Sequence, residues 1–342
     1  MTYRLGWSIV PQILIKRERW PGGNIVQGIP LVSPGQYVLP DQPVLRTEQA
    51  EPIESRHTIP HLPSPPTPNL PSGQEHTAAG SYSGIQHRRG GETFPAGLSG
   101  RVVSITPRGG VVIESPAAVL QGVIGAGNQV VGVLTMWQAS FARATGKLTI
   151  PPGALLVVPG PINFTLLRQA SISGVVGLIA SSVALRDLEG FLQTDVIRLV
   201  NSADVEAAQA KLPKISLLFT EGSGNIAMST RTINLLNHYQ GSIALLSGAT
   251  SVKQRIVPEL VISLPPQEVE QHWHPRKPDT TIKVGVKVRI CSGDFVGMMG
   301  EVDYLFTHQQ LFLSGIYAPA ARLRLEDDSL LVMPLTGVER VS

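Results

Sequence analysis

Glycines and polar side chains follow the apolar runs between residues 153 and 265, at positions where a ligand could bind. Gly222 and Gly224 precede a predicted helix, so their backbone N–H groups could face an anion. The carboxyl group of Glu221 could act as an acid or a base in a dry pocket. A serine before a helix can equally be an ordinary N-cap, which stabilises the helix by about 0.5–2 kcal/mol without any ligand. The candidates for a ligand site are Ser181, Ser182, Arg186, Glu221, Gly222 and Gly224.

The sequence lacks the motifs that mark several well-known classes of enzyme. It contains no G-x-S-x-G elbow, no G-x-x-x-x-G-K-[ST] loop and no H-E-x-x-H pair, and His238 lies on a predicted helix opposite no obvious nucleophile. Cys291 is the single cysteine, which excludes an internal disulfide and is expected to be a buried, inert thiol. His272 and His274 have no carboxylate cluster nearby and are not expected to bind a metal ion. These features favour a protein that is not an enzyme and holds no metal ion or cofactor.

An α/β domain is predicted to position the candidate ligand site. Apolar runs of five to seven residues alternate with amphipathic segments of roughly ten to twelve, which is typical of βαβ units with buried parallel strands. Strands are expected within 154–160, 175–182, 215–222, 242–248 and 258–265, and helices within 163–174, 184–193 and 229–240. We therefore predict a three-layer α/β domain over residues 151–266, with its functional loops beyond the carboxyl ends of the strands.

Two β-type segments flank a stretch that is rich in Pro, Ser, Gly and His. The first, Gly28–Glu48, alternates apolar residues with Pro-Gly and Pro-Asp turns; the second, Gly97–Glu114, contains two predicted strands around Arg108-Gly109-Gly110. Residues 51–96 between them are predicted to be a disordered Pro-rich linker, because they contain few aliphatic side chains to bury. Residues 1–50 and 97–150 are predicted to form one split β domain.

The two segments resemble the halves of a barrel-sandwich hybrid, the biotinyl/lipoyl-like fold. The matching patterns are V-x-x-G-Q-Y-V-x-x-x-Q-x-V-L before the linker and L-S-G-R-V-V-x-I-x-x-x-G-G-V-V-I after it. The Met-Lys-Met or Asp-Lys-Ala turn that carries biotin or lipoate in modified members is absent. The resemblance thus implies a fold and no prosthetic group.

The last sixty residues follow a polar connector predicted over 267–280. Val286, Val288 and Ile290 alternate with polar residues, and a turn that contains Gly293 and Gly297 leads to Gly300 and a second alternating strand. An intervening hairpin and the closing strands follow. This pattern resembles the KOW motif of ribosomal proteins and NusG-type transcription factors. The resemblance implies an SH3-like barrel over residues 281–342, in a family where such barrels bind RNA, bind protein or act as structural caps.

The charges allow two kinds of partner. The net charge of +3 is small for 342 residues, and residues 275–342 carry eight basic and eight acidic side chains. Basic side chains could contact phosphates, but Glu301, Asp303 and the run 326–328 oppose them, so a protein contact is at least as well supported. The candidates for contact with nucleic acid or a partner are Lys287, Arg289, Arg322, Arg324, Lys16, Arg17, Arg19 and Trp20.

The sequence therefore predicts a multi-domain α/β plus all-β protein with three hypotheses for its function. The first is a non-enzymatic binding or scaffold protein that contacts RNA or a nucleic-acid-processing complex (a ribonucleoprotein) through the KOW-like barrel. The second is a structural, self-assembling or protein-interaction protein, and the third is a small-ligand enzyme or sensor. The start of the chain does not read as a signal peptide, and no uninterrupted apolar run reaches about 18 residues. A cytoplasmic protein without membrane contact is expected.

Overall fold

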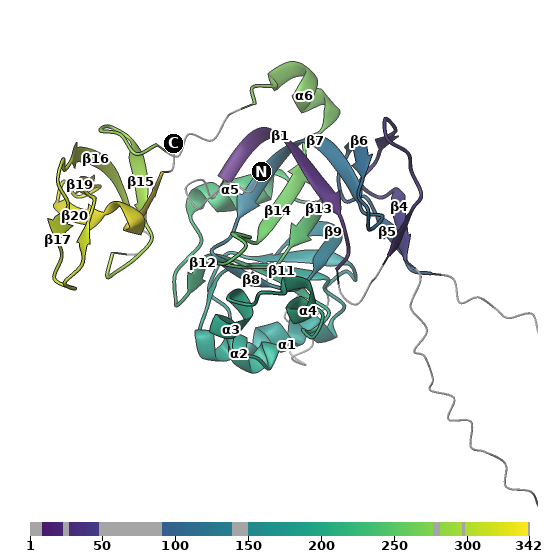
Figure 1. The fold of residues 1–342 in the computed structure, drawn as a ribbon, viewed down its shortest axis with the longest axis horizontal. Coiled ribbons are helices and arrows are strands. Elements are labelled where there is room, and N and C mark those ends of the chain that lie inside the picture. The colour runs from purple at the N-terminus through teal and green to yellow at the C-terminus, as the bar shows by residue number, and fades with distance from the viewer. Residues whose placement is uncertain are drawn as a thin grey trace, which may run out of the picture.

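The computed structural model describes residues 9–22, 27–47, 91–138, 150–275, 281–295 and 298–340 (Figure 1). Most of the predicted linker, residues 51–90, lies outside the described residues. Its predicted end is wrong, because Thr93–Pro95 forms β5, which pairs antiparallel with β4 (Pro43–Thr47). Polar and Pro-rich composition obscured this strand, since a short edge strand needs few apolar residues.

Within the described residues, most strands belong to one eleven-stranded sheet. Its order is β3 (Tyr37–Val38), β6 (Gly100–Ile105), β7 (Val111–Gln121), β14 (Glu259–Ser263), β13 (Ile243–Ser247), β9 (Gln129–Met136), β10 (Ala154–Val158), β11 (Gly177–Val183), β12 (Ser216–Ser223) and β8 (Ile124–Ala126), with β1 (Ile9–Arg19) paired to β7. We call this sheet and the elements packed on it the body.

The middle of the sheet is parallel, as the alternation of apolar runs and helices predicts. Strands β9, β10, β11 and β12 pair in parallel, and every residue of β10 and β11 is buried. Helices α1 (Phe164–Ile172), α2 (Leu185–Leu192) and α5 (Thr230–His238) lie at the predicted places. Side chains of α1, α2 and α3 (Val196–Val200) pack with Phe219 on one face of the sheet, and those of α5 pack with Leu218 on the other. A mixed α/β architecture is therefore confirmed.

The N-terminal β segments join the same sheet. β7 pairs antiparallel with β14, and β9 pairs with β10 across the predicted boundary at residue 150. The turn at Arg108–Gly110 forms as predicted and brings the two segments together: Gly28 N–H donates to Arg108 O at 2.8 Å. Gly109 has φ +85°, and a Cβ there would lie 1.9 Å from Gly28 O, so this close approach requires glycine. Strand β2 (Gly28–Pro30) then pairs with β4 to cover this end of the body. A division into separate domains at residue 150 stays a prediction.

The C-terminal module, residues 281–340, has its own sheet and core beside the body (Figure 1). Five antiparallel strands are ordered β20 (Leu330–Pro334), β19 (Ala320–Leu325), β16 (Met299–Leu305), β15 (Lys287–Ile290) and β21 (Val338–Arg340). A separate hairpin joins β17 (Gln310–Leu311) to β18 (Tyr317–Ala318). Before the module, Pro266–His272 forms helix α6, where the sequence analysis expected only a connector; Val269 packs it on the body.

Candidate functional site

The six predicted ligand-site residues do not gather around one ligand position. Ser181 and Ser182 are both fully buried in β11. The hydroxyl of Ser182 is used within the fold, because it accepts from Ile226 N–H at 3.0 Å and lies 3.0 Å from Ile226 O. Arg186 is 94% exposed, and Asp187 lies 3.9 Å from its Nε. Burial contradicts the predicted ligand contacts of Ser181 and Ser182, whereas a ligand contact of solvent-exposed Arg186 stays a prediction.

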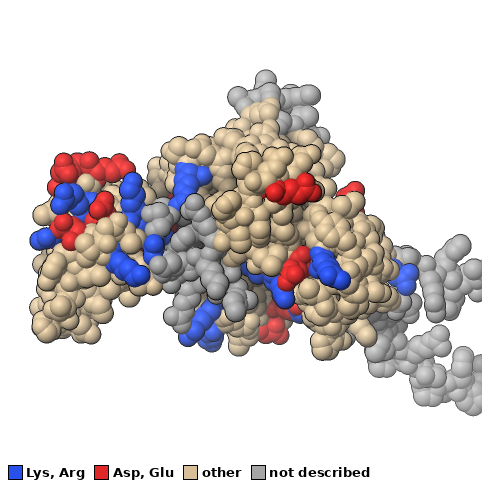
Figure 2. Space-filling model, turned by 90° about the horizontal axis from the view of Figure 1, so that it is seen from above, with Lys and Arg blue, Asp and Glu red and all other residues tan. Residues whose placement is uncertain are grey.

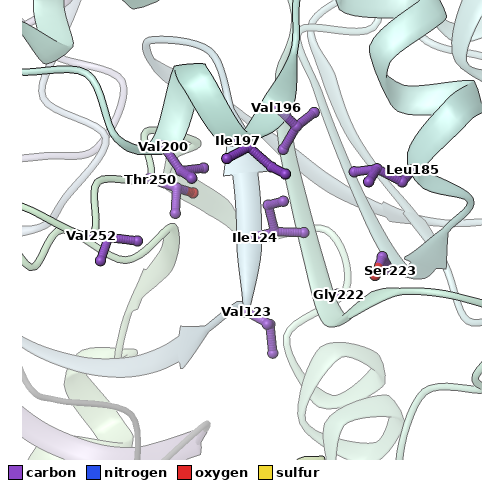
Figure 3. Close-up of a pocket in the computed structure, with 10 residues that line it drawn as sticks. All are labelled: Val123, Ile124, Leu185, Val196, Ile197, Val200, Gly222, Ser223, Thr250 and Val252. Atoms are coloured by element: carbon purple, nitrogen blue, oxygen red, sulfur yellow. The ribbon is translucent and has the colours of Figure 1, made fainter.

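An apolar pocket lies instead at the carboxyl end of β12 (Figure 3). It has a volume of about 260 Å³, and its lining includes Gly222 and Ser223 of β12. Gly222 adopts φ +81°, a conformation that side chains rarely allow. Among the described residues that line the pocket, none is charged. Aliphatic side chains from three elements (β8, α2 and α3) and two loops point into it, including Val123, Ile124, Leu185, Ile197, Val200 and Val252.

Arg289 of the C-terminal module is buried between two carboxylates, Glu221 of the body and Glu339 of the module. One guanidinium nitrogen of Arg289, in β15, donates to Glu221, and Arg289 Nε lies 2.8 Å from Glu339 Oε1 in β21. Arg289 and Glu339 are cross-strand partners in the module, whereas Glu221 belongs to the body. All three side chains are less than 9% exposed. We call Glu221, Arg289 and Glu339 the ion triad; it joins the body to the module.

Burial and charge act against each other in the ion triad. Desolvation raises the pKa of Glu221, and the positive charge of Arg289 opposes this only in part. Burial would lower the pKa of Arg289, but the charges of Glu339 and Glu221 outweigh it and keep the guanidinium protonated. Arg289 is therefore not available to bind RNA in this conformation, contrary to the sequence-based prediction. Strand alternation puts Arg289 on the face opposite the module core, and the fold sets Glu221 of the body against that face.

The raised pKa of Glu221 predicts a specific dependence of stability on pH. The folded protein holds the Glu221 proton more tightly than the unfolded chain does, so this group destabilises the fold as pH rises from about 4.5 through its folded pKa. We expect the free energy of unfolding of wild type to fall, relative to that of Glu221→Gln, as pH increases from about 4.5 to 7. Urea unfolding at a series of pH values measures this difference. If the free energy of unfolding of wild type instead rises relative to that of the variant over the same range, the pKa of Glu221 is not raised.

The basic residues near the N-terminus are used within the body. Lys16 Nζ lies 3.1 Å from Glu114, and Arg17 donates to Glu259 at 2.5 and 2.8 Å. Arg19 is 2% exposed and Trp20 is 7% exposed. Buried side chains cannot contact a partner at the surface, so the prediction of a contact is wrong for Arg19 and Trp20. Lys16 remains exposed, and its role as a contact stays a prediction.

The basic side chains of the module are mostly balanced by acidic ones. Arg322 Nη2 lies 2.5 Å from Asp303 and Arg324 Nη2 lies 3.0 Å from it, and both lower the pKa of that carboxyl group. Lys287 is exposed opposite Glu301 in the β15–β16 pair. Figure 2 shows basic and acidic side chains interspersed on the visible face of the module, at the left. A single continuous basic surface, as phosphate binding favours, is not visible on this face.

The β17–β18 hairpin exposes four large apolar side chains. Leu311 and Tyr317 are cross-strand partners and are 60% and 65% exposed. Near the turn, Leu313 is fully exposed and Ile316 is 60% exposed. In Figure 1 this hairpin lies on the side of the module away from the body. We call Leu311, Leu313, Ile316 and Tyr317 the hairpin patch.

Sequence reasoning missed the hairpin patch and the apolar pocket. The hairpin itself was expected, and the run Leu311-Phe312-Leu313 followed by Ile316-Tyr317 is a visible signal of unusual apolar content in a turn. The pocket lining comes from segments far apart in the sequence, so no local pattern reveals it.

Cys291 differs in part from its prediction. The residue is exposed rather than buried, and its Sγ lies 3.7 Å from Arg289 O. Although the residue as a whole is exposed, desolvation by the surrounding protein atoms, together with the charge of Glu339, raises the thiol pKa to about 12. An inert thiol stays a prediction, since a protonated thiol is a poor nucleophile.

In the described part of the chain, no group of three or more His, Cys, Asp or Glu side chains is arranged to hold a metal ion. No helix in the same ranges is long and apolar enough to cross a membrane.

Comparison with known proteins does not place the chain in a family. No family model and no curated protein matches it. Among solved structures, it is similar to a chain in the crystal structure of the MjSpt4:Spt5 complex, conformation B, with 18% identity over 26% of this chain and 73% of that chain. The TM-score is 0.15. A likeness this weak establishes neither the fold nor the function of this chain.

Proposed function

We propose that this chain is a non-enzymatic scaffold protein whose C-terminal module binds a protein partner through the hairpin patch. The observation that carries the proposal is the exposure of four large apolar side chains on one short hairpin. Soluble proteins rarely leave such clusters exposed without a use for them. The antiparallel five-stranded sheet supports a KOW-type SH3-like barrel as the scaffold of the hairpin.

The charges of the module support a protein partner over RNA. Asp303 neutralises Arg322 and Arg324, and Arg289 is buried in the ion triad. Binding of RNA or a ribonucleoprotein is the competing proposal, for which exposed Lys287 is the main support. The two differ in salt dependence: phosphate contacts weaken steeply as salt rises, whereas apolar contacts persist.

Purification of the tagged full-length protein from the organism that makes it, at low and then high salt, tests this function. We expect a protein partner that stays bound at high salt and is recovered at least tenfold less with Leu313→Ser/Ile316→Ser, because central apolar contacts dominate binding. Ile172→Ser is the matched control, since Ile172 is 71% exposed on α1 of the body. Recovery of RNA that is lost at high salt and with Lys287→Glu would instead support the competing proposal.

A further inference from the structure

The apolar pocket at the end of β12 has the features of a binding site, and the proposed function does not use it. It lies at the carboxyl ends of parallel strands β11 and β12, which is where open α/β sheets bind ligands. Gly222 and Ser223, the last two residues of β12, line the pocket. Leu185, which also lines it, is the first residue of the helix that follows β11. The pocket therefore occupies the functional edge of the sheet.

Exposed aliphatic side chains converge around the pocket. Val123 is 43% exposed, Leu185 39%, Ile197 63% and Val252 65%. They come from the segment before β8, from α2, from α3 (Val196–Val200) and from the loop after β13, as Figure 3 shows. A hydrogen bond of 2.9 Å from Val252 N–H to Val200 O fixes two of these walls to each other. An occupant would remove this apolar surface from water, which favours binding.

The polar groups at the pocket limit the chemistry of its occupant. The Thr250 hydroxyl is already used, because it accepts from Gly125 N–H and donates to Gly125 O, both at 2.9 Å. Ser223 is exposed, and its hydroxyl makes no hydrogen bond within the described ranges of the chain. Charged ligands would find no opposite charge in the lining. The remaining polar contact is one hydroxyl group at the edge of an aliphatic surface.

The volume limits the size of the occupant. At about 30 Å³ for each water-sized group, 260 Å³ corresponds to about nine such groups. This is smaller than the sites that hold drug-sized molecules, which begin at about 300 Å³.

We propose that this pocket binds a small uncharged aliphatic molecule of about eight to ten non-hydrogen atoms, with one hydroxyl or similar polar end beside Ser223. The aliphatic chain lies against Ile197 and Val252, and the polar end exchanges a hydrogen bond with the Ser223 hydroxyl.

Titration of the full-length protein with 1-octanol, followed by NMR or calorimetry, tests the proposal. We expect saturable binding to wild type, weaker binding of octanoate, and at least tenfold weaker octanol binding to Ile197→Glu and to Val252→Glu. Both residues are well over half exposed, so the substitutions are compatible with folding. Ile172→Glu, on the surface of α1 and outside the lining, should bind octanol as wild type does. No saturation, equal losses in Ile197→Glu and Ile172→Glu, or tighter binding of octanoate would overturn it. None of these readouts depends on the hairpin patch.

Discussion

Replacing Arg289 with alanine is expected to release the C-terminal module from the body. The substitution leaves Glu221 and Glu339 buried without a positive partner, and removal of one member of a buried ion pair costs about 3–5 kcal/mol. Because Glu221 belongs to the body, this cost acts on the contact between the two parts. Small-angle X-ray scattering of the full-length protein should show an increased radius of gyration. A variant as compact as wild type would contradict the role of the ion triad.

Two further variants separate charge pairing from simple loss of packing. Arg322→Ala removes an arginine that is paired with Asp303 at the exposed surface, so the radius of gyration should not change. The triple variant Arg289→Met, Glu221→Gln, Glu339→Gln leaves no buried charge in the ion triad and should restore much of the compactness that Arg289→Ala loses. If the triple variant is as expanded as Arg289→Ala, the unpaired carboxylates are not the cause.

Replacing Arg19 with alanine is expected to destabilise the body by about 2–3 kcal/mol. Arg19 donates from Nε to Pro95 O at 2.8 Å and from Nη1 to Gln129 Oε1 at 2.9 Å, and so connects β1, β5 and β9. Its loss leaves the carbonyl of Pro95 without this donor. Burial also lowers the pKa of Arg19 to about 10, so the side chain is held by hydrogen bonds in an environment that disfavours its charge.

Chemical unfolding of the full-length protein measures the effect of the Arg19 substitution. Lys16→Ala is the control, because Lys16 is exposed and its partner Glu114 is only partly buried, so the midpoint of unfolding should hardly move. Arg19→Met keeps the apolar stem and should lose less than Arg19→Ala. Equal stability of Arg19→Ala and Lys16→Ala would show that the buried hydrogen bonds contribute little.

The α/β elements could be predicted because their signal is local. The runs that become β10, β11 and β12 are continuously apolar, which is typical of strands that are covered on both faces. The starts of α1 and α5 are likewise marked by Asn163 and Ser229, whose side chains accept from backbone N–H groups of the first turn.

The candidate sites depend on contacts between distant segments, which local patterns do not contain. Alternation placed Arg289 opposite the module core and suggested solvent, but Glu221 covers it from 68 residues away. Ser182 looked like a cap or a ligand donor, yet Ile226, 44 residues away, takes both of its hydrogen bonds. The sequence indicates which face a side chain occupies, and the tertiary fold decides what that face meets.

Hydrogen exchange of the full-length protein, alone and in complex with its purified partner, tests whether the module, held to the body through the ion triad, offers the hairpin patch to a protein. We predict slowed exchange of the backbone amides of residues 310–318 in the complex, with unchanged exchange in β15 around Lys287. Slowed exchange at Lys287, with the hairpin unchanged, would contradict the account.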